Sequence, residues 1–378
     1  MRTPFDFGGS VDAVHFVNRE AELEMLTRNF HAAQNTVLIS PRRWGKSSLV
    51  NRAIALATAP GRGRPLRVVR LDLLAVRTEG QLLSAYLEAT LRAFGGTPER
   101  AIAALREAAA VLVPKVSFTA GTDAEFKIGF DWRGAPADRP TILELPERLA
   151  ERRGERAVVA IDEFQQIAEL DDAPGFDAVL RSHWQHHRRV CYCLYGSKRH
   201  MMLKLFGSYG APFYHFADAH VLEKIGRAHW MGYIVDRFAR FRKTISREQA
   251  DRLAAYVDDH SHYVQQIAQL AFGLTRETCD AEVVDAAYEQ LLYQLEPFFS
   301  QQLAPLSRTQ IGFLHAVFDG QQAFSSREVL DGYGLGSSAN ASKLKGVMQE
   351  REFVYPDRKG RFAFVDPVFR GWLARRWS

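Results

Sequence analysis

The chain has 378 residues, 47% of them hydrophobic, and a net charge of +5 at pH 7. A chain of this length can bury large cores and is expected to divide into two or three domains. Its three cysteines exclude a disulfide framework and favour the cytoplasm. No apolar run approaches the roughly 18 residues of a membrane span, and no signal peptide is recognisable, so we expect no membrane partner.

The first recognisable chemistry is a phosphate-binding loop. After an expected helix that starts near residue 16, an apolar strand at 36–40 runs into a tight loop and then a helix. Backbone N–H groups of such a loop face a polyphosphate, Lys46 can reach its β- and γ-phosphates, and the Ser47 hydroxyl can ligate Mg²⁺. Ser40 stands where the regular pattern has glycine. The residues expected to bind nucleotide here are Ser40, Pro41, Arg42, Arg43, Trp44, Gly45, Lys46, Ser47 and Ser48.

A second signal lies about 115 residues downstream, where the apolar strand 157–161 ends in Asp162 and Glu163. Ligands bind at the carboxyl ends of buried parallel strands. We therefore expect Asp162 to hold Mg²⁺ opposite Ser47, and Glu163 to orient and deprotonate the attacking water. The alternative interpretation is a strand that ends in a solvated acidic turn.

Strands and helices alternate over the first 226 residues, which predicts a three-layer α/β core around a five-stranded parallel sheet. The strand candidates are 36–40, 66–73, 157–161, 190–196 and 213–222, and the main helix candidates between them are 46–59, 79–94, 141–153 and 175–187. The strand at 190–196 is expected to lie between strand 36–40, which precedes the phosphate-binding loop, and strand 157–161, which ends in the two carboxylates. Cys191 and Cys193 are interpreted there as buried packing. Residues 97–140 read as an excursion containing a hairpin about a Gly-Thr-Asp turn.

The remainder is expected to form a helical lid at 227–299 and a winged helix-turn-helix at 300–378. Ser307 is a helix cap, and residues 325–328 have capping-box spacing. A third helix and a hairpin about residues 356–360 complete the pattern. This last domain carries 11 Lys and Arg against 7 Asp and Glu.

Such an excess permits contact with double-stranded DNA, and the alternative is a winged helix that packs on the α/β core. The candidate DNA contacts are Ser338, Asn340, Ser342, Lys343 and Lys345 on the third helix, with Arg358, Lys359 and Arg361 in the wing.

Other polar clusters have less specific interpretations. His183, His186 and His187 have the spacing of one helix face, for which a polar helix end is favoured over zinc. Arg199, or Arg188 and Arg189, are candidate arginine fingers, although a solvated basic turn is the preferred interpretation.

The ordered set of motifs resembles the archaeal-type ATPase family, of the STAND/AAA+-like branch of P-loop proteins. The motifs that carry the resemblance are Asn18-Arg19-Glu20, Pro41-Arg42-Arg43-Trp44-Gly45-Lys46-Ser47-Ser48-Leu49, Asp162-Glu163-Phe164-Gln165, Gly196-Ser197 and Asp366-Pro367-Val368-Phe369. The likeness spans almost the whole chain.

The resemblance implies ATP and Mg²⁺ as ligands, with catalytic roles for Lys46, Glu163 and Ser197. It places Ser197 near the γ-phosphate or the attacking water, although a helix cap is an equal alternative, and Asn18 and Arg19 beside the adenine. The family's Gly-Gly-x-Pro-Tyr-like loop is altered here to residues 259–263, with His262 in place of proline.

Two functions follow as hypotheses. The first is an ATP-hydrolysing molecular switch with slow intrinsic turnover, coupling nucleotide state to the position of lid and winged helix, with a protein partner or a second copy of the chain. The second is a DNA-binding adaptor in which ATP is mainly structural.

Overall fold

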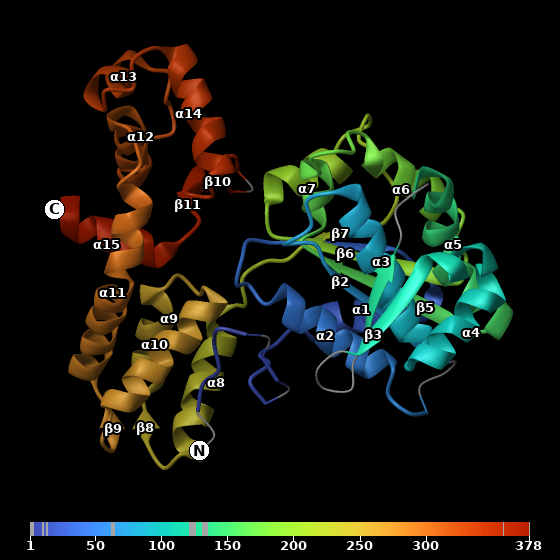
Figure 1. Ribbon diagram of the computed structural model, residues 1–378. Coiled ribbons are helices and arrows are strands. Elements are labelled where there is room, and N and C mark those ends of the chain that lie inside the picture. The colour runs from blue at the N-terminus through green and yellow to red at the C-terminus, as the bar shows by residue number, and fades with distance from the viewer. Residues whose placement is uncertain are drawn as a thin grey trace. The chain divides into compact units, whose positions relative to one another are not determined.

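The computed structural model describes residues 4–9, 11–12, 14–61, 65–120, 126–130, 135–357 and 359–377. They form two compact units (Figure 1). The core unit comprises residues 19–42 and 46–223. The C-terminal unit comprises residues 43–45, residues 224–378 and the N-terminal segment up to residue 18, as far as they are described.

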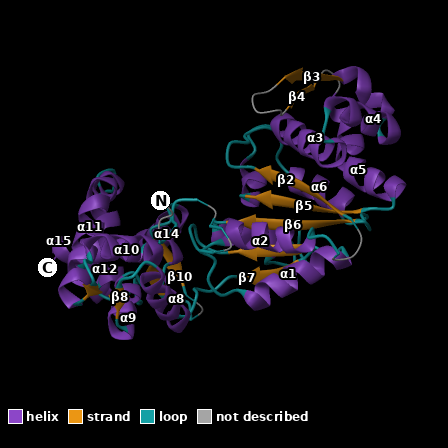
Figure 2. Cartoon of the chain, turned by 90° about the horizontal axis from the view of Figure 1, so that it is seen from below, coloured by secondary structure: helices purple, strands orange, loops and turns teal. Residues whose placement is uncertain are grey.

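A five-stranded parallel sheet forms the centre of the core unit, in the order β2-β5-β6-β1-β7 (Figure 2). Its strands are β1 (Thr36–Ile39), β2 (Leu66–Asp72), β5 (Arg156–Asp162), β6 (Val190–Gly196) and β7 (Asp218–Val221). β6 lies between β1 and β5, as the sequence predicted. β7 is shorter than the expected 213–222, because residues 213–217 form turns and bends that include a left-handed backbone at His215.

Helices cover both faces of this sheet, because successive residues of a strand point to opposite sides. The Sγ atom of Cys191 in β6 lies 3.9 Å from the Phe30 carbonyl oxygen of α1 (Glu20–Ala32). On the other face, the Tyr192 hydroxyl lies 3.1 Å from that of Tyr86 in α3 (Glu79–Gly95). The other helices of the unit are α2 (Lys46–Ala57), α4 (Pro98–Ala108), α5 (Ala135–Arg153), α6 (Phe176–Trp184) and α7 (Arg199–Phe206), with 3₁₀ turns η1 (Ala110–Lys115) and η2 (Phe164–Glu169). The chain has the three-layer α/β core that its pattern predicts.

The excursion contains the antiparallel strands β3 (Val116–Ala120) and β4 (Phe126–Phe130), which confirms the expected hairpin. The Gly-Thr-Asp turn at 121–123 lies outside the described residues.

The C-terminal unit begins with four helices: α8 (Arg227–Arg240), α9 (Arg247–Tyr256), α10 (Ser261–Leu274) and α11 (Ala281–Leu303). Two short strands, β8 (Thr244–Ile245) and β9 (Thr278–Cys279), pair between them. Next come α12 (Arg308–Phe318), α13 (Arg327–Gly332), α14 (Ser338–Glu350), an antiparallel hairpin of β10 (Val354–Pro356) and β11 (Phe362–Phe364), and α15 (Pro367–Trp377). We call residues 307–377 the C-terminal module.

Helix caps set the boundaries of the module, as expected from its serines. Ser307 and Gln310 form a reciprocal capping box at α12. At α13 the cap is Ser326, one residue later than the box spacing suggested, and Ser337 caps α14.

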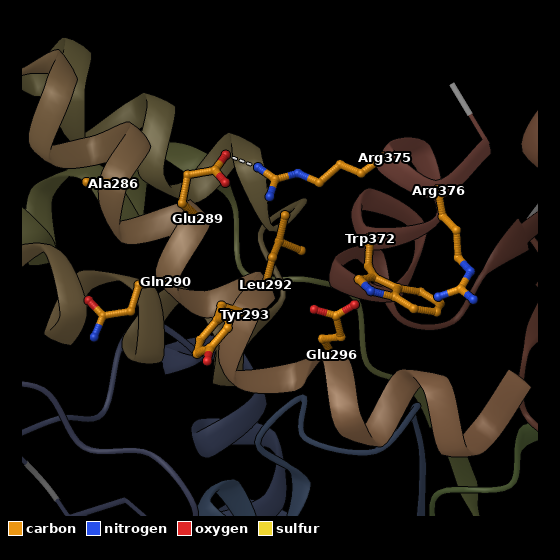
Figure 3. A pocket seen from close by; sticks show the side chains of 9 residues that line it. All are labelled: Ala286, Glu289, Gln290, Leu292, Tyr293, Glu296, Trp372, Arg375 and Arg376. Carbon is orange, nitrogen blue, oxygen red and sulfur yellow. Dashed lines mark ion pairs between the residues drawn. The ribbon is translucent and has the colours of Figure 1, made fainter.

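One hydrophobic core joins α8–α11 to the C-terminal module, and it includes Trp230, Val264, Leu291, Phe313 and Trp372. The Tyr263 hydroxyl of α10 also donates a hydrogen bond to Asp366, just before α15. Between α11 and α15 lies a pocket of about 710 Å³, across which Glu289 and Arg375 form an ion pair (Figure 3). The described helices include none that is both long and apolar enough to cross a membrane.

Candidate nucleotide site

The carboxyl ends of β1, β5 and β6 bring the predicted site residues of the core unit together. Register pairs Ile39 with Gly196 across β1 and β6, and Ile161 with Leu194 across β5 and β6. The residues that follow these strand ends are therefore neighbours at one edge of the sheet, although they are far apart in sequence.

Ser47 and Asp162 meet directly at this edge. The Ser47 hydroxyl in the first turn of α2 donates to Asp162 Oδ2 at 2.7 Å, and the backbone N–H of Glu163 donates to Asp162 Oδ1 at 2.8 Å. Burial raises the pKa of Asp162, and these two hydrogen bonds oppose that rise. The loop and the carboxylates thus lie at the same edge of the sheet, as the sequence predicts.

Glu163 is held by two donors on one oxygen. Ser197 Oγ donates to Glu163 Oε2 at 2.8 Å, and the Gln165 side-chain amide donates to the same oxygen. Burial opposes ionisation of Glu163, but these donors and the charges of Lys46 and Arg42 outweigh it, so its pKa lies below its usual value. Glu163 is therefore poised as a carboxylate that can accept a proton.

Lys46 lies buried at the start of α2, with its ammonium directed into the loop. Its Nζ donates to the carbonyl oxygens of Ser40 at 3.1 Å and Pro41 at 3.4 Å. A loop that curls around a lysine at a helix N-terminus is the arrangement that favours a bound anion.

The loop tolerates Ser40 in place of glycine because positive backbone φ angles occur elsewhere in it. Arg43 has φ 64° and Gly45 has φ 90°, whereas Ser40 is not among the described residues with positive φ. Ser40 is also fully buried, with its hydroxyl donating to the Pro41 carbonyl oxygen.

Other candidate binding residues are engaged elsewhere. The buried guanidinium of Arg19 pairs with Glu22 and donates to the carbonyl oxygen of Glu223. Asn18, Arg43, Trp44 and Gly45 group with the C-terminal unit. Within that unit the Trp44 ring is 7% exposed, and the Lys224 ammonium lies 5.7 Å from its centroid.

The donor set of the site suits Mg²⁺. Mg²⁺ takes oxygen ligands, usually one or two from protein carboxylates, and keeps waters and phosphate oxygens for the rest. Ser47 and Asp162 supply one hydroxyl and one carboxylate side by side. No cluster of three or more His, Cys, Asp or Glu side chains able to hold a metal ion occurs in the described part of the chain.

The chain matches no protein-family model, and no curated protein matches it. Among solved structures, it is similar to the Walker-type ATPase PABY2304 of Pyrococcus abyssi, with a TM-score of 0.66 at 15% identity, over 98% of this chain and 99% of that one. It is also similar to the ORC2 protein of Aeropyrum pernix in ADPNP-ADP complexes, with a TM-score of 0.57 at 15% identity, over 95% of each chain.

The chain has the fold of a Walker-type ATPase. The same likeness extends to the ADP form of the Aeropyrum pernix ORC2 protein, with a TM-score of 0.56 at 13% identity, over 97% of each chain. The chain therefore shares its fold with these proteins over nearly their full lengths.

The histidine cluster is a hydrogen-bonded network. α6 ends at Trp184, so His186 and His187 lie beyond the helix that was expected to present all three histidines. His183 and His187 contact opposite oxygens of Glu144, at 2.8 and 3.2 Å, and His187 also contacts the Tyr192 hydroxyl. These contacts agree with the preferred interpretation of a polar helix end.

The arginine-finger candidates differ in position. Arg188 and Arg189 precede β6, and their backbone N–H groups donate to Glu147. They lie at the amino end of a seven-residue strand, about 20 Å from the edge of the sheet at which Ser47 and Asp162 meet. Arg199 begins α7, three residues after β6 ends, and is the nearer candidate.

The structure divides the DNA-contact candidates on α14 and the wing into two groups. Ser338, Ser342, Lys343 and Lys359 are exposed. By contrast, the Asn340 amide donates to the Leu335 carbonyl oxygen, the Lys345 ammonium lies over the rings of Phe324 and Phe362, and Arg361 pairs with Asp357. Arg358 lies outside the described residues.

Gln165 has no predicted role, although it belongs to the Asp-Glu-Phe-Gln motif. Its buried amide touches the expected catalytic base, and its spacing of two residues after Glu163 was the available signal.

Proposed function

We propose that the chain binds ATP with Mg²⁺ and hydrolyses it as a molecular switch of the STAND/AAA+-like class. The observation that carries the proposal is the convergence of Lys46, Ser47, Asp162 and Glu163 at one edge of the sheet. In this proposal Lys46 contacts the terminal phosphates, and Ser47 and Asp162 hold Mg²⁺, directly or through water. Bound Mg²⁺ would offset the negative charge of the phosphates.

Glu163 is the proposed general base, with Ser197 holding its carboxylate. The hydrogen bonds that hold the Glu163 carboxylate at the edge of the sheet beside Ser197 support this role. The ADPNP-ADP complexes of the similar ORC2 protein support adenine nucleotides as the ligand class.

The switch mechanism depends on contacts to the γ-phosphate that disappear on cleavage. We propose that their loss changes the position of the C-terminal unit. Because α8–α11 and the C-terminal module share one core, that unit would move as a single body. Slow intrinsic turnover is expected from a switch that waits for its partner.

The test separates binding from chemistry. Lys46→Ala should reduce ATP affinity at least 10-fold, whereas Glu163→Gln should bind ATP as the unchanged protein does and lose at least 100-fold in hydrolysis rate. Lys204→Ala, which alters an exposed lysine on α7, is the control for lost charge. Full ATPase activity in the Glu163→Gln protein would contradict the assignment of the base.

A DNA-binding adaptor is the second candidate, favoured by the exposed serines and lysines of α14 and the wing. In this proposal residues 307–377 act as a winged helix that contacts duplex DNA, and hydrolysis is dispensable.

Each lysine–phosphate contact contributes about 0.9 to the slope of log affinity against log salt. Replacing both Lys343 and Lys359 by alanine should therefore lower the slope by about 2 in a filter-binding salt titration. Lys345→Ala is the matched control, because its ammonium packs on aromatic rings. An unchanged slope in the double variant, or no binding by the unchanged protein, would rule against this candidate.

A further inference from the structure

Gln165 is almost completely buried, at 2% exposure, on the 3₁₀ turn η2 that follows β5. Its side-chain nitrogen donates to Glu163 Oε2, the oxygen that also accepts from Ser197. Within the described residues, no hydrogen bond reaches the other oxygen, Oε1. The two donors therefore fix one side of the carboxylate and leave the other side available to a proton.

The Gln165 amide makes this contact at a cost. Its carbonyl oxygen is buried and has no hydrogen-bond partner among the described residues. An unsatisfied buried acceptor lowers the stability of the fold, so stability alone does not explain this amide. The amide nitrogen donates to Glu163, and the amide oxygen has no hydrogen-bond partner among the described residues.

Gly196 makes room for this amide at the end of β6. A Cβ atom at this position would lie 2.0 Å from Gln165 Oε1 and 2.8 Å from Met202 Sδ. Gly196 is not one of the described glycines with a positive backbone φ. Glycine is therefore needed here for space and not for its backbone conformation. Gly196 and Gln165 thus form a matched pair behind Glu163.

The backbone of Glu163 adds a reason for an external hold. Its φ of 51° lies in the left-handed region, which residues other than glycine adopt only at a cost in conformational energy. Among the described residues, the hydrogen bonds that orient its carboxylate come from Gln165 and Ser197.

We propose that Gln165 is a positioning residue, which with Ser197 holds Glu163 Oε2 so that Oε1 faces the attacking water. This inference rests on the proposed ATPase function. Loss of the amide leaves Ser197 as a single donor and frees the carboxylate to rotate. Misplacement of a catalytic group by about 1 Å costs on the order of 100-fold in rate, so kcat should fall about 10- to 100-fold.

The test uses Gln165→Leu in the full chain, which keeps an apolar side chain of similar size and removes the donor. Its matched control is Gln166→Leu, the adjacent buried glutamine on the same turn, whose amide faces Glu169 and Arg77. Steady-state hydrolysis of Mg-ATP gives kcat and KM, and a fluorescent ATP analogue gives affinity. Gln165→Leu should lose kcat with KM and affinity unchanged, while Gln166→Leu should keep its kcat.

A double-mutant cycle distinguishes positioning from general support of the fold. Once Glu163→Gln has removed the base, adding Gln165→Leu should cost nothing more in single-turnover hydrolysis. Gln165→Glu, which keeps the shape and replaces the donor, provides a second variant and should also lose kcat.

The outcomes separate the two claims. An unchanged protein that neither binds nor hydrolyses ATP overturns the proposed function. If the unchanged protein is active, two results overturn only the positioning role. The first is full kcat in both Gln165 variants. The second is an equal loss from Gln165→Leu in the presence and in the absence of Glu163.

Discussion

Asp162 and Glu163 are adjacent in the chain, yet the pKa of the first is raised and that of the second is lowered. Both are partly buried, so the difference comes from their partners. Asp162 accepts from one hydroxyl and one backbone N–H, which do not offset its burial. Glu163 accepts from two side-chain donors and lies near two cations. One carboxylate therefore gains most from a bound cation, and the other is ionised at neutral pH without one.

At the same scale, His260 makes a pH dependence testable. Burial first, then the charges of His262 and Lys224, lower its pKa to about 3. The unfolded chain, with an ordinary histidine near pH 6.5, takes up the proton that the folded state excludes. Stability is therefore lost as pH falls below about 6.5, by about 2 kcal/mol between pH 6.5 and pH 4.5 for this group.

Urea unfolding of the C-terminal unit's helices at the two pH values measures the loss. His260→Leu should reduce the loss by about 2 kcal/mol and leave the part due to His262, whose pKa burial lowers to about 4. His229→Gln, at an exposed histidine, should leave the dependence unchanged. A dependence equally steep in the His260→Leu protein would contradict this explanation.

Helices α11 and α15 show how one small residue sets the packing of two elements. A Cβ atom at Gly371 in α15 would lie 2.0 Å from the Tyr288 hydroxyl of α11 and 3.3 Å from its ring. The neighbouring Glu289–Arg375 ion pair is exposed and contributes little to stability. Close approach of the helices therefore depends mainly on the missing side chain.

Gly371→Ala should lower stability by about 1–3 kcal/mol, because the overpacked contact exceeds the gain in helix propensity. Gly346→Ala in α14 is the matched control. It has no atom within 4 Å of the added Cβ and should raise stability by about 0.5–1 kcal/mol. Thermal unfolding compares the two, and adding Tyr288→Phe to Gly371→Ala should restore part of the loss. A neutral Gly371→Ala variant would show that α15 shifts freely.

At the scale of the whole molecule, the two units have separate hydrophobic cores. The first gathers residues of the sheet with α3–α6, and the second runs from Phe5 through α8–α11 into the C-terminal module. The N-terminal segment joins the second core through the buried Phe5. Two hydrogen bonds hold it there, from Arg237 to the Pro4 carbonyl oxygen and from the Asp6 backbone N–H to Gln265.

Leu83→Ala in the first core and Leu314→Ala in the second should each cost about 2–5 kcal/mol, since both side chains are fully buried. Hydrogen exchange should show the loss of protection in different places. Leu83→Ala should affect the core unit alone, whereas Leu314→Ala, in α12, should also loosen α8–α11 through the shared core. Loosening confined to α12–α15 would mean that the module folds separately from α8–α11.

Much of this architecture could be predicted from sequence because its signals are local. Continuous apolar runs indicated the strands of a parallel sheet, Gly-Lys-Ser indicated a loop that opens a helix, and serine caps indicated helix starts. The parallel strands then placed Asp162 beside Ser47, because their carboxyl ends meet at one edge.

Only the tertiary structure decided how individual side chains are used. It assigned Arg19 to Glu22 and Glu223, Lys345 to two aromatic rings, and Gln165 to Glu163. Long polar and charged side chains form hydrogen bonds, ion pairs and ring contacts with residues that are often distant in the sequence. No local sequence pattern encodes which of those residues the fold brings near. Backbone periodicity is determined by neighbouring residues, and side-chain partnership is determined by the whole fold.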